Sequence, residues 1–327
     1  MRHIILFSAA FLAPMVITGQ SQVSITQPSV GLSQIPLWIA DEQGLFARHG
    51  VEALILNTDR ARPVEKEIQI GVMGIPAAIA AVARGRDLKL LLTLNSELSD
   101  GYLVVRPGIH TAADLRGKRF GVLAIGKGYW ISSILALQRL GLEPKRDRIS
   151  FLEVGDLLRI VQSLQSGEID AATLDPAQTM ELKSKGFPIL LDMRQANVPG
   201  IQSGMVVAGD YLRQHPDVVE KAVTALVEGI AFSLSPANER SVLKTMTTHL
   251  RITSLEAAGR GYESFLSRAN RKLYASVAAI KSMQRVMALD DPKVLNVKVE
   301  EMIEERFLRK LDESGALDRI YSAYGVK

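Results

Sequence analysis

The sequence contains no cysteine among its 327 residues. That absence excludes disulfide bonds, thiolate ligands for a metal ion and a cysteine nucleophile. It also excludes a lipid attached through an N-terminal cysteine. With 47% apolar and 23% charged residues, the composition is that of a globular protein able to bury one large core or two smaller ones.

Sequence motifs of catalysis and metal binding are also missing. The five histidines have no spacing typical of metal ligands, and the Gly-x-Ser-x-Gly sequence of a nucleophile elbow is absent. The net charge of +4 comes from scattered basic residues, which is compatible with an anionic ligand but predicts no nucleic-acid partner. We therefore predict no catalytic residue, no metal and no cofactor.

The first 21 residues differ from the rest of the chain. The positively charged Arg2 precedes a largely apolar run, residues 4–17, and the small residues Gly19 and Ser21 suit a signal-peptidase site. The apolar run has 14 residues, fewer than the roughly 18 to 20 that span a bilayer. We predict a signal peptide over residues 1–21, cleaved on export, and a periplasmic mature protein.

Short apolar runs alternate with helical patterns from residue 23 to about residue 210. This alternation is typical of a parallel sheet flanked by helices, and we therefore predict an α/β fold. Most runs lack an alternating polar face, as expected of strands covered on both sides. The predicted strands are Val23–Thr26, Val51–Leu56, Ile68–Met73, Leu88–Leu94, Tyr102–Val105, Arg119–Leu123, Ile149–Val154, Ile169–Leu174 and Ile189–Leu191.

Helix signals fill the gaps between these strands. Beyond Pro216 the pattern is almost wholly helical. The spacings of Thr111 with Asp114 and of Thr253 with Glu256 predict capping boxes at helix starts. Three predicted helices stop before a glycine that suits a left-handed C-terminal cap, namely residues 76–84 before Gly85, 129–140 before Gly141 and 157–166 before Gly167.

Two segments of the chain share an order of parts. Residues 67–92 and 168–191 both read Glu-Ile, strand, proline, short helix, glycine, strand. Unrelated βαβ units can have the same order of elements, but two similar lobes in one chain would also produce this repeat. We interpret the repeat as two α/β lobes that face a cleft.

Five segments follow one another in a recognisable order: PLWIADEQGLFARHGVEALIL (36–56), LVVRPGIHTAADLRGKRFGV (103–122), LQRLGLEPKRDRISFLEVG (137–155), LQSGEIDAATLDPAQ (164–178) and LRQHPDVVEKAVTALVEGI (212–230). By their order and spacing they resemble the substrate-binding proteins of bacterial ABC importers, in the nitrate, sulfonate, taurine and thiamine-precursor type group. The sequence departs from that pattern at residues 57–67, which lack the Gly-Gly or Gly-Ser stretch frequent in the family.

The resemblance implies a two-lobed periplasmic-binding-protein fold of type II, with two crossovers between the lobes. Residues 22–105 and the mostly helical residues 208–327 would form the first lobe, and residues 106–207 the second. It further implies a monomeric binding protein that closes around a small-molecule ligand and delivers it to an ABC transporter permease in the inner membrane. The ligand would be a sulfonate-like or nitrate-like anion, or a thiamine-precursor-like heterocycle.

Ligands of open α/β sheets bind beyond the carboxyl ends of the strands, where helix N-termini offer unpaired N–H groups. A serine or glycine at such a place can equally be a cap or a turn residue. The predicted ligand-binding residues are Ser33, Gln34, Gly74, Ile75, Asn95, Ser96, Gly126, Lys127, Gly128, Tyr129, Asp175 and Gln202.

Some of these positions carry specific hypotheses. The turn at Gly126 and Lys127 combines a helix start with an ammonium group, which favours an anion, although Lys127 can also be a solvated turn residue. Gly126→Asp is therefore predicted to abolish binding and to leave the fold intact. Asp175 either caps its own helix or faces a ligand amine or hydroxyl. Trp38 and Trp130 either cover an apolar part of the ligand or pack in the core.

Two other functions remain open at this point. A pyrimidine-precursor synthase of thiamine biosynthesis is an enzyme on the same fold, but those enzymes look cysteine-rich near their sites and this chain has no cysteine. The paired lobes of a transcriptional regulator would need a DNA-binding helix-turn-helix where this chain has a signal peptide. We therefore favour a binding protein that is not an enzyme.

Overall fold

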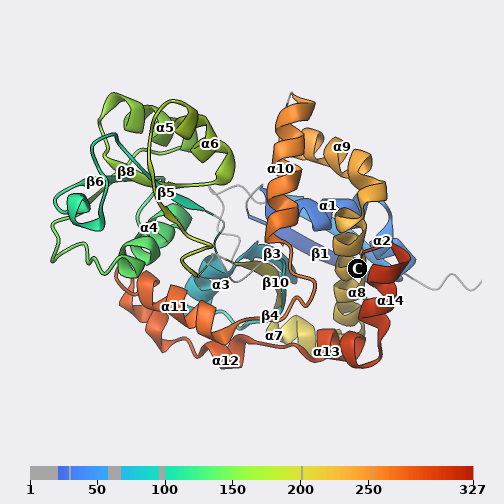
Figure 1. Cartoon of the computed structure of the whole chain (residues 1–327). Helices are drawn as coiled ribbons and strands as arrows, with labels where there is room; N and C mark the ends of the chain where they lie inside the picture. The colour runs from blue at the N-terminus through green and yellow to red at the C-terminus, as the bar shows by residue number, and fades with distance from the viewer. Residues whose placement is uncertain are drawn as a thin grey trace, which may run out of the picture.

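The computed structural model describes residues 21–28, 31–57, 68–95, 99, 101–199, 202–252 and 254–326. Within these residues the chain forms two lobes, each built on a five-stranded sheet that helices cover (Figure 1). The predicted α/β fold is therefore confirmed. The predicted signal peptide lies outside the described residues except for Ser21, which begins the first strand.

The first sheet is built from β1 (Ser21–Gln27), β2 (Val51–Asn57), β3 (Ile70–Gly74), β4 (Leu88–Thr93) and β10 (Ser203–Ala208). Its strand order is β2-β1-β3-β10-β4. Strands β1, β2 and β3 pair in parallel, whereas β10 pairs antiparallel with both of its neighbours. Strand β10, the last of the five in the sequence, was not among the predicted strands.

The second sheet is built from β5 (Tyr102–Val105), β6 (Arg119–Val122), β7 (Ser150–Glu153), β8 (Ala171–Leu174) and β9 (Ile189–Asp192). Its order is β7-β6-β8-β5-β9, and β5 runs antiparallel to β8 and β9. The prediction of parallel sheets is therefore wrong for one strand in each lobe. A strand that enters from the other lobe starts at the edge where the other strands end, so it runs in the opposite direction.

The two antiparallel strands also mark where the chain changes lobe. Strand β5 belongs to the second sheet and β10 to the first. The predicted boundaries, after residues 105 and 207, would leave each of these strands in the wrong lobe. We propose instead that the chain crosses between β4 and β5 and returns between β9 and β10.

The internal repeat corresponds to equivalent places in the two sheets. In the first lobe β3 leads through α3 (Ile75–Ala83) to β4, and in the second β8 leads through α6 (Pro176–Ser184) to β9. Strands β3 and β8 are both the third strand of their sheets, and β4 and β9 are both the last. The interpretation of the repeat as two similar lobes is confirmed by this topology.

The other helices complete the lobes and the C-terminal region. Among the described residues, none is long and apolar enough to cross a membrane. They are α1 (Ile35–Glu42), α2 (Leu45–Arg48), α4 (Gly128–Arg139), α5 (Leu157–Ser166), α7 (Gly209–Gln214), α8 (Pro216–Leu234), α9 (Glu239–His249), α10 (Leu255–Arg268), α11 (Val277–Met287), α12 (Val299–Met302), α13 (Arg306–Glu313) and α14 (Ala316–Ala323). Short 3-10 helices cover Leu32–Gln34, Ala112–Leu115, Pro236–Asn238 and Pro292–Asn296.

Most local signals at helix ends are confirmed. Gly85, Gly141 and Gly167 have φ of +91°, +72° and +83°, the left-handed conformation that ends a helix. The capping box of Thr111 and Asp114 is present, although the helix it starts is a 3-10 helix.

The other predicted capping box is displaced by one residue. Thr253 lies outside the described residues, and the N-cap of α10 is Ser254, whose hydroxyl accepts a hydrogen bond from the Ala257 N–H at 3.3 Å. Two adjacent hydroxyl residues both suit an N-cap, so the sequence pattern alone could not choose between them.

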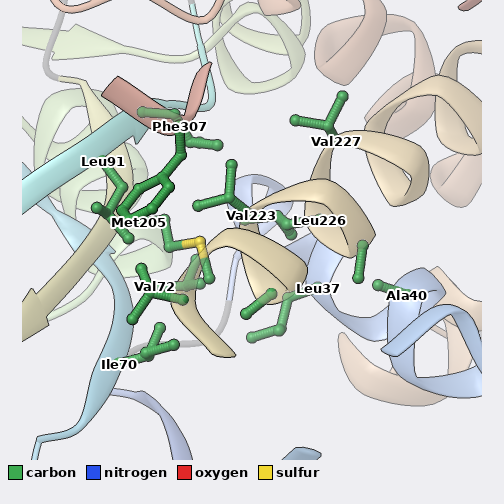
Figure 2. Packing of buried hydrophobic residues seen from close by; sticks show 14 of the residues in the cluster. Leu37, Ala40, Ile70, Val72, Leu91, Met205, Val223, Leu226, Val227 and Phe307 are labelled. Atoms are coloured by element: carbon green, nitrogen blue, oxygen red, sulfur yellow. The ribbon is translucent and has the colours of Figure 1, made fainter. Parts of the chain in front are cut away.

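The core of the first lobe lies between its sheet and the helices α1 and α8. Figure 2 shows Val72 and Met205 of the sheet beside Val223 and Leu226 of α8. Phe307 of α13 adjoins the same cluster. Full burial of one such side chain contributes about 1.5 to 3 kcal/mol. Since α8 and α13 follow the return strand, the first lobe needs both of its chain segments to complete its core.

A second buried cluster joins the lobes. It contains Ile79 of α3 in the first lobe, Ile134 of α4 in the second and Met283 of α11. Helix α11 comes from the C-terminal region and contacts both α3 and α4 (Figure 1). The lobes therefore share an apolar seam.

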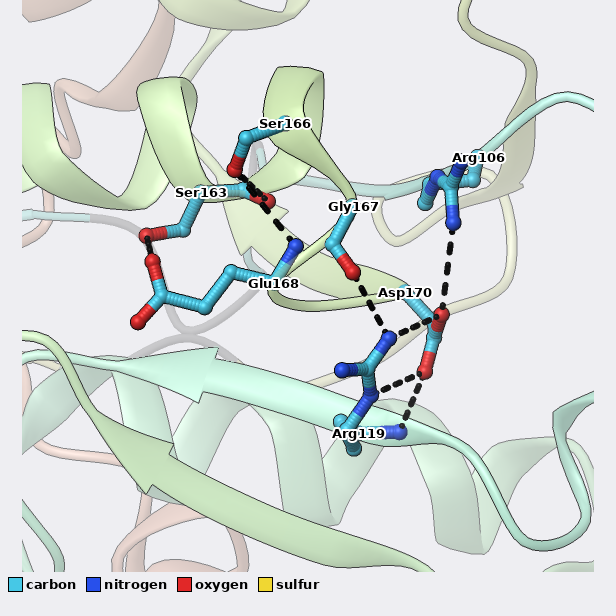
Figure 3. Close-up of polar contacts among 7 residues, drawn as sticks. All are labelled: Arg106, Arg119, Ser163, Ser166, Gly167, Glu168 and Asp170. Carbon is cyan, nitrogen blue, oxygen red and sulfur yellow. Dashed lines mark hydrogen bonds and ion pairs between the residues drawn. The ribbon is translucent and has the colours of Figure 1, made fainter.

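A cluster of polar side chains lies at the edge of the second sheet where β8 begins (Figure 3). The Asp170 carboxylate accepts hydrogen bonds from the Arg119 N–H and Nε at 3.0 and 2.9 Å, and Arg106 lies 3.9 Å away. Burial alone would raise the pKa of Asp170, but the hydrogen bonds and the charge of Arg119 lower it. This cluster precedes β8, whereas a ligand site would lie beyond its carboxyl end.

Candidate ligand-binding site

The helix of each repeat begins where its strand ends. Strand β3 ends at Gly74, which is the N-cap of α3 with φ −65° and ψ 135°. Strand β8 ends at Leu174, and the next residue, Asp175, is the N-cap of α6 with φ −72° and ψ 161°. These equivalent turns lie at the carboxyl ends of parallel strands, which is where ligands of open α/β sheets bind.

The Asp175 carboxylate binds side chains from both lobes. Its Oδ2 accepts a hydrogen bond from the Tyr129 hydroxyl at 2.8 Å, and its Oδ1 accepts one from Arg268 Nη2 at 2.9 Å. Tyr129 lies in the first turn of α4 in the second lobe, whereas Arg268 is the last residue of α10. We call Tyr129, Asp175 and Arg268 the interlobe cluster.

Helix α10 connects this cluster to the first lobe. It packs against α9 and against the 3-10 helix that precedes α1, and it also contacts α6 of the second lobe (Figure 1). Directly after it, Ala269 forms an isolated antiparallel bridge with Asn95, just beyond β4. The ion pair of Arg268 and Asp175 therefore spans the two lobes.

The capping role predicted for Asp175 is wrong in this structure. Asp175 holds the N-cap position of α6, but its side chain makes no capping hydrogen bond. Its two oxygens are directed instead to Tyr129 and Arg268. A charge-assisted bond to a guanidinium competes with a cap because both need the same carboxylate.

Asn95 and Gln202 come together at the two passages between the lobes. The Asn95 Oδ1 accepts a hydrogen bond from the Ser203 N–H at 2.7 Å, and Gln202 Nε2 donates to the Asn95 carbonyl at 3.3 Å. Gln202 is 2% exposed. Its Oε1 is buried and has no hydrogen-bond partner in the described part of the chain. A buried acceptor of this kind is costly unless a partner satisfies it.

Gly74 and Ile75 lie beside the same passage. The Ile75 N–H donates to the Gln202 carbonyl at 2.9 Å, and Gly74 pairs with Ser203 across the sheet. The Ile75 side chain is buried, so its contribution to a site would come from the backbone. Ser96, also predicted here, lies outside the described residues.

Ser33 and Gln34 form a local pair ahead of α1. The Ser33 hydroxyl donates to Gln34 Oε1 at 3.1 Å, and the Gln34 side chain is buried. The 3-10 helix that contains them contacts α10. A ligand role for the two residues stays a prediction.

The turn before α4 has surroundings that disfavour an anion. The Ile125 N–H donates to the Glu153 carboxylate at 2.7 Å. Gly126 has φ +73°, and a Cβ there would collide with the Asp290 carboxylate. Lys127 is exposed and makes no side-chain cap, and Gly128 begins α4 behind it. The chain's own carboxylates thus already face this turn.

These surroundings also affect the variant predicted from the sequence. Gly126→Asp would place a second carboxylate against Asp290 on a backbone that favours glycine. Loss of binding in that variant could therefore result from local distortion, and the prediction that the fold stays intact does not suit this geometry.

The two tryptophans pack in the core. Trp38 is 2% exposed, its Nε1 donates to Gln27 Oε1 at 2.9 Å, and its ring stacks on His249 with centroids 4.5 Å apart. Trp130 is 5% exposed and meets Phe151 edge-on. Of the two roles considered for these rings, the structure supports core packing.

A cavity of about 470 Å³ opens between α6 and α10, next to the interlobe cluster. Pro176 and Met180 line it from the second lobe, and Arg260 and Ser267 line it from α10. Among the described residues, no group of three histidine, aspartate or glutamate side chains could hold a metal ion. The cavity has both polar and apolar walls, which suits a small organic molecule.

Arg268 and α10 are the parts of the site that sequence reasoning missed. Arg268 is 93 residues from Asp175 in the chain, and it ends an ordinary amphipathic helix with no glycine or strand end beside it. The bridge between Ala269 and Asn95 brings it to the site. That pairing is a tertiary contact, so the local sequence carries no signal for it.

Comparison with known proteins gives one family. The model of the family described as NMT1/THI5 like matches residues 32–239 of the chain. Among curated proteins, no sequence matches.

Solved structures share the fold over most of the chain. The periplasmic sulfonate-binding protein SsuA from Methylobacillus flagellatus KT has a TM-score of 0.74 at 16% identity, over 92% of this chain and 97% of its own. SsuA from Escherichia coli, an aliphatic sulphonate binding protein, has a TM-score of 0.65 at 18% identity, over 86% and 96%. The desulfurization enzyme DSZB has a TM-score of 0.62 at 18% identity, over 90% and 99%. Identities this low show the fold alone.

Proposed function

Since this chain belongs to the NMT1/THI5-like family, we propose that it is the solute-binding component of an ABC transporter. It captures a small organic or inorganic anion in the cleft between its lobes. The fold it shares with two sulfonate-binding proteins supports this role. A thiamine-precursor-like heterocycle is the other ligand class compatible with the family resemblance.

The observation that carries the proposal is the convergence of side chains from both lobes on one carboxylate. Tyr129 and Arg268 reach Asp175 from different lobes, at 2.8 and 2.9 Å. An arginine and a hydroxyl directed at the same acceptor are a common arrangement for binding a carboxylate, sulfonate or phosphate group. The region between the lobes therefore has the chemistry to hold an anion.

The transport role follows from the way such lobes move. A ligand that contacts both lobes binds the closed form better than the open form, so it shifts the population toward closure. In this proposal the apolar seam at Ile79, Ile134 and Met283 acts as the pivot. The closed surface is the form that a membrane permease would recognise, and the binding protein itself acts as a monomer.

Export is part of the same proposal. A signal peptide over residues 1–21 would direct the protein to the periplasm. N-terminal sequencing of the periplasmic protein should find a start between Gln20 and Val23. A full-length product that stays in the cytoplasm would contradict the transport role.

Ligand capture is tested by native mass spectrometry of the protein purified without denaturation, followed by thermal melts. A ligand at 100 times its dissociation constant stabilises the folded state by about 2.7 kcal/mol. For roughly 300 residues that unfold as one unit, this corresponds to a shift of about 4 °C. We expect one chemical class among sulfonates, nitrate, carboxylates and pyrimidines to give that shift. No shift with any class, and no retained ligand, would contradict the proposal.

The same samples separate binding from catalysis. The enzyme DSZB shares the fold, so the fold does not exclude turnover. We expect every compound that shifts the melt to be recovered unchanged. Recovery of a chemically altered compound would favour an enzyme, including a pyrimidine-precursor synthase.

A further inference from the structure

We propose that the position of the Asp175 carboxylate is the anion subsite of the cleft. The sulfonate or carboxylate group of a ligand takes the place of that carboxylate between Arg268 and Tyr129, and Asp175 turns to cap α6. This inference rests on the proposed function and assigns its binding contacts to named residues.

The donors of the interlobe cluster fit a ligand anion. The Asp175 oxygens are divided, one to Tyr129 and one to Arg268. A sulfonate has three oxygens and a carboxylate two, so either group can accept from both donors at once. Because Tyr129 and Arg268 belong to different lobes, a ligand anion at this point would itself join the lobes.

Asp175 can be displaced at little cost. The side chains of Arg268 and Asp175 are 27% and 40% exposed, and ion pairs in contact with solvent contribute little to stability. Asp175 also has a second partner within reach of its side chain. Its backbone has the extended conformation of an N-cap residue, and aspartate is among the best N-caps. After a change of rotamer, the carboxylate could accept from the backbone N–H groups in the first turn of α6.

An independent feature of the same region indicates a ligand. Gln202 is almost fully buried, and its Oε1 lacks a hydrogen-bond partner among the residues described. Its Nε2 bonds to the Asn95 carbonyl, and Asn95 is bridged to Ala269, next to Arg268. A ligand that carries a hydroxyl or amine beside its anionic group could satisfy this acceptor.

A purely structural role for the ion pair makes the opposite prediction. If Asp175 and Arg268 only held the lobes closed, neutralising Asp175 would favour the open form and weaken ligand binding. If Asp175 occupies the anion subsite, the same change removes a carboxylate that competes with the ligand for Arg268, and it strengthens binding. Asparagine caps a helix about as well as aspartate, so Asp175→Asn removes the charge and keeps the capping ability. Its effect on ligand binding therefore has opposite signs in the two roles.

The test is isothermal titration calorimetry of the mature protein at constant ionic strength. The probes are methanesulfonate, acetate, nitrate and a neutral aminopyrimidine. For the anion that binds the wild type, we expect Arg268→Gln to weaken binding by about tenfold or more, because a charge-assisted bond is lost. Arg268→Lys should recover part of that loss. Tyr129→Phe should weaken binding roughly fivefold, and Asp175→Asn should strengthen it by a similar factor.

The ion pair of Arg213 and Asp87 supplies matched controls. It has a similar distance, 3.0 Å, but both partners are exposed and belong to the first lobe. Arg213→Gln and Asp87→Asn make the same changes of charge and should leave each dissociation constant unchanged. Circular dichroism melts of all variants show whether the fold is kept. If Arg268→Gln fails to fold, the Asp175→Asn result still decides, since its expected sign is opposite in the two roles.

The outcomes distinguish this inference from the proposed function. Weaker binding in Asp175→Asn, or unchanged binding in a folded Arg268→Gln, overturns the subsite. Binding of the aminopyrimidine alone also overturns it but leaves the solute-binding function in place. If no probe binds and native mass spectrometry finds no retained ligand, both proposals fail.

Discussion

Replacing Glu228 with glutamine should destabilise the protein by about 2 kcal/mol. Glu228 lies on α8, and its side chain is 12% exposed. It accepts hydrogen bonds from Arg48 Nη1 at 2.6 Å and from the Tyr324 hydroxyl at 2.6 Å, and it pairs with His49 Nε2 at 2.7 Å. One carboxylate thus joins α8 to the end of α2 and to the end of α14.

The magnitude follows from the number and exposure of these contacts. A hydrogen bond to a charged group contributes about 1.5 to 3 kcal/mol, and a neutral one about 1 kcal/mol. Glutamine keeps an acceptor oxygen and the shape of glutamate, so Glu228→Gln removes the charge and little else. Arg48 is 57% exposed, and its contribution is therefore small. The bonds from Tyr324 and His49 then account for most of the expected loss.

The pH dependence supplies a second readout. Burial alone would raise the pKa of Glu228, but the hydrogen bonds from Tyr324 and His49 and the charge of Arg48 lower it. A carboxyl with a lowered pKa in the folded state binds protons more weakly than in the unfolded chain. Its stabilisation is therefore complete above the ordinary glutamate pKa of about 4.3, and it is lost as the pH falls through the folded value.

Urea denaturation followed by circular dichroism measures both effects. We expect the difference between wild type and Glu228→Gln to be full at neutral pH and to shrink in acid. Glu220→Gln is the control, because Glu220 lies on the same helix and pairs at 2.6 Å with Lys310, which is 67% exposed. It should cost less than about 1 kcal/mol. Equal losses in the two variants, or an undiminished difference in acid, would refute the reasoning.

The same assay tests packing and capping elsewhere. Gly229→Ala should cost about 1 to 3 kcal/mol, because a Cβ there would lie 2.5 Å from the Pro36 carbonyl oxygen. Gly259→Ala, in a helix with nothing within 4 Å, should instead stabilise by roughly 0.5 to 1 kcal/mol, and a loss there would contradict this account. Asp156→Ala should cost about 1 kcal/mol, because the Asp156 side chain accepts from the Arg159 N–H at 2.8 Å to cap α5. Asp156→Asn should keep most of that stability, and equal losses in both would argue against a cap.

The parts of the fold that sequence reasoning predicted correctly depend on local physics. Gly141 and Gly167 end their helices because a left-handed residue is needed there, and most apolar runs became strands that are largely buried in their sheets. Both kinds of signal act within a few residues. The strands other than β10, and the ends of the helices before Gly85, Gly141 and Gly167, could therefore be predicted closely.

The parts that sequence reasoning did not predict depend on contacts between distant segments. The antiparallel direction of β5 and β10 follows from the side on which the chain enters each sheet, and no residue within those strands encodes it. The partner of Asp175 could not be predicted for the same reason, since α10 reaches the site through a bridge far along the chain. Of the predicted site residues, Asn95 is hydrogen-bonded to Gln202 and Asp175 to Tyr129, whereas the turn at Gly126 faces Asp290.

The internal repeat gives a reason to connect the proposed selectivity with the turn after β8. The turns after β3 and β8 are equivalent in the fold, but the first has Gly74 at the N-cap of α3 and the second has Asp175 at the N-cap of α6. In the first lobe the N-cap residue Gly74 has no side chain, and the N–H of Ile75 is already bound to the Gln202 carbonyl, so that turn carries no charge. In the second lobe the equivalent turn carries a carboxylate that reaches across to Arg268. Two similar lobes thus differ in charge at this pair of turns. If the proposed subsite is correct, a ligand without an anionic group would require changes at Asp175 and Arg268.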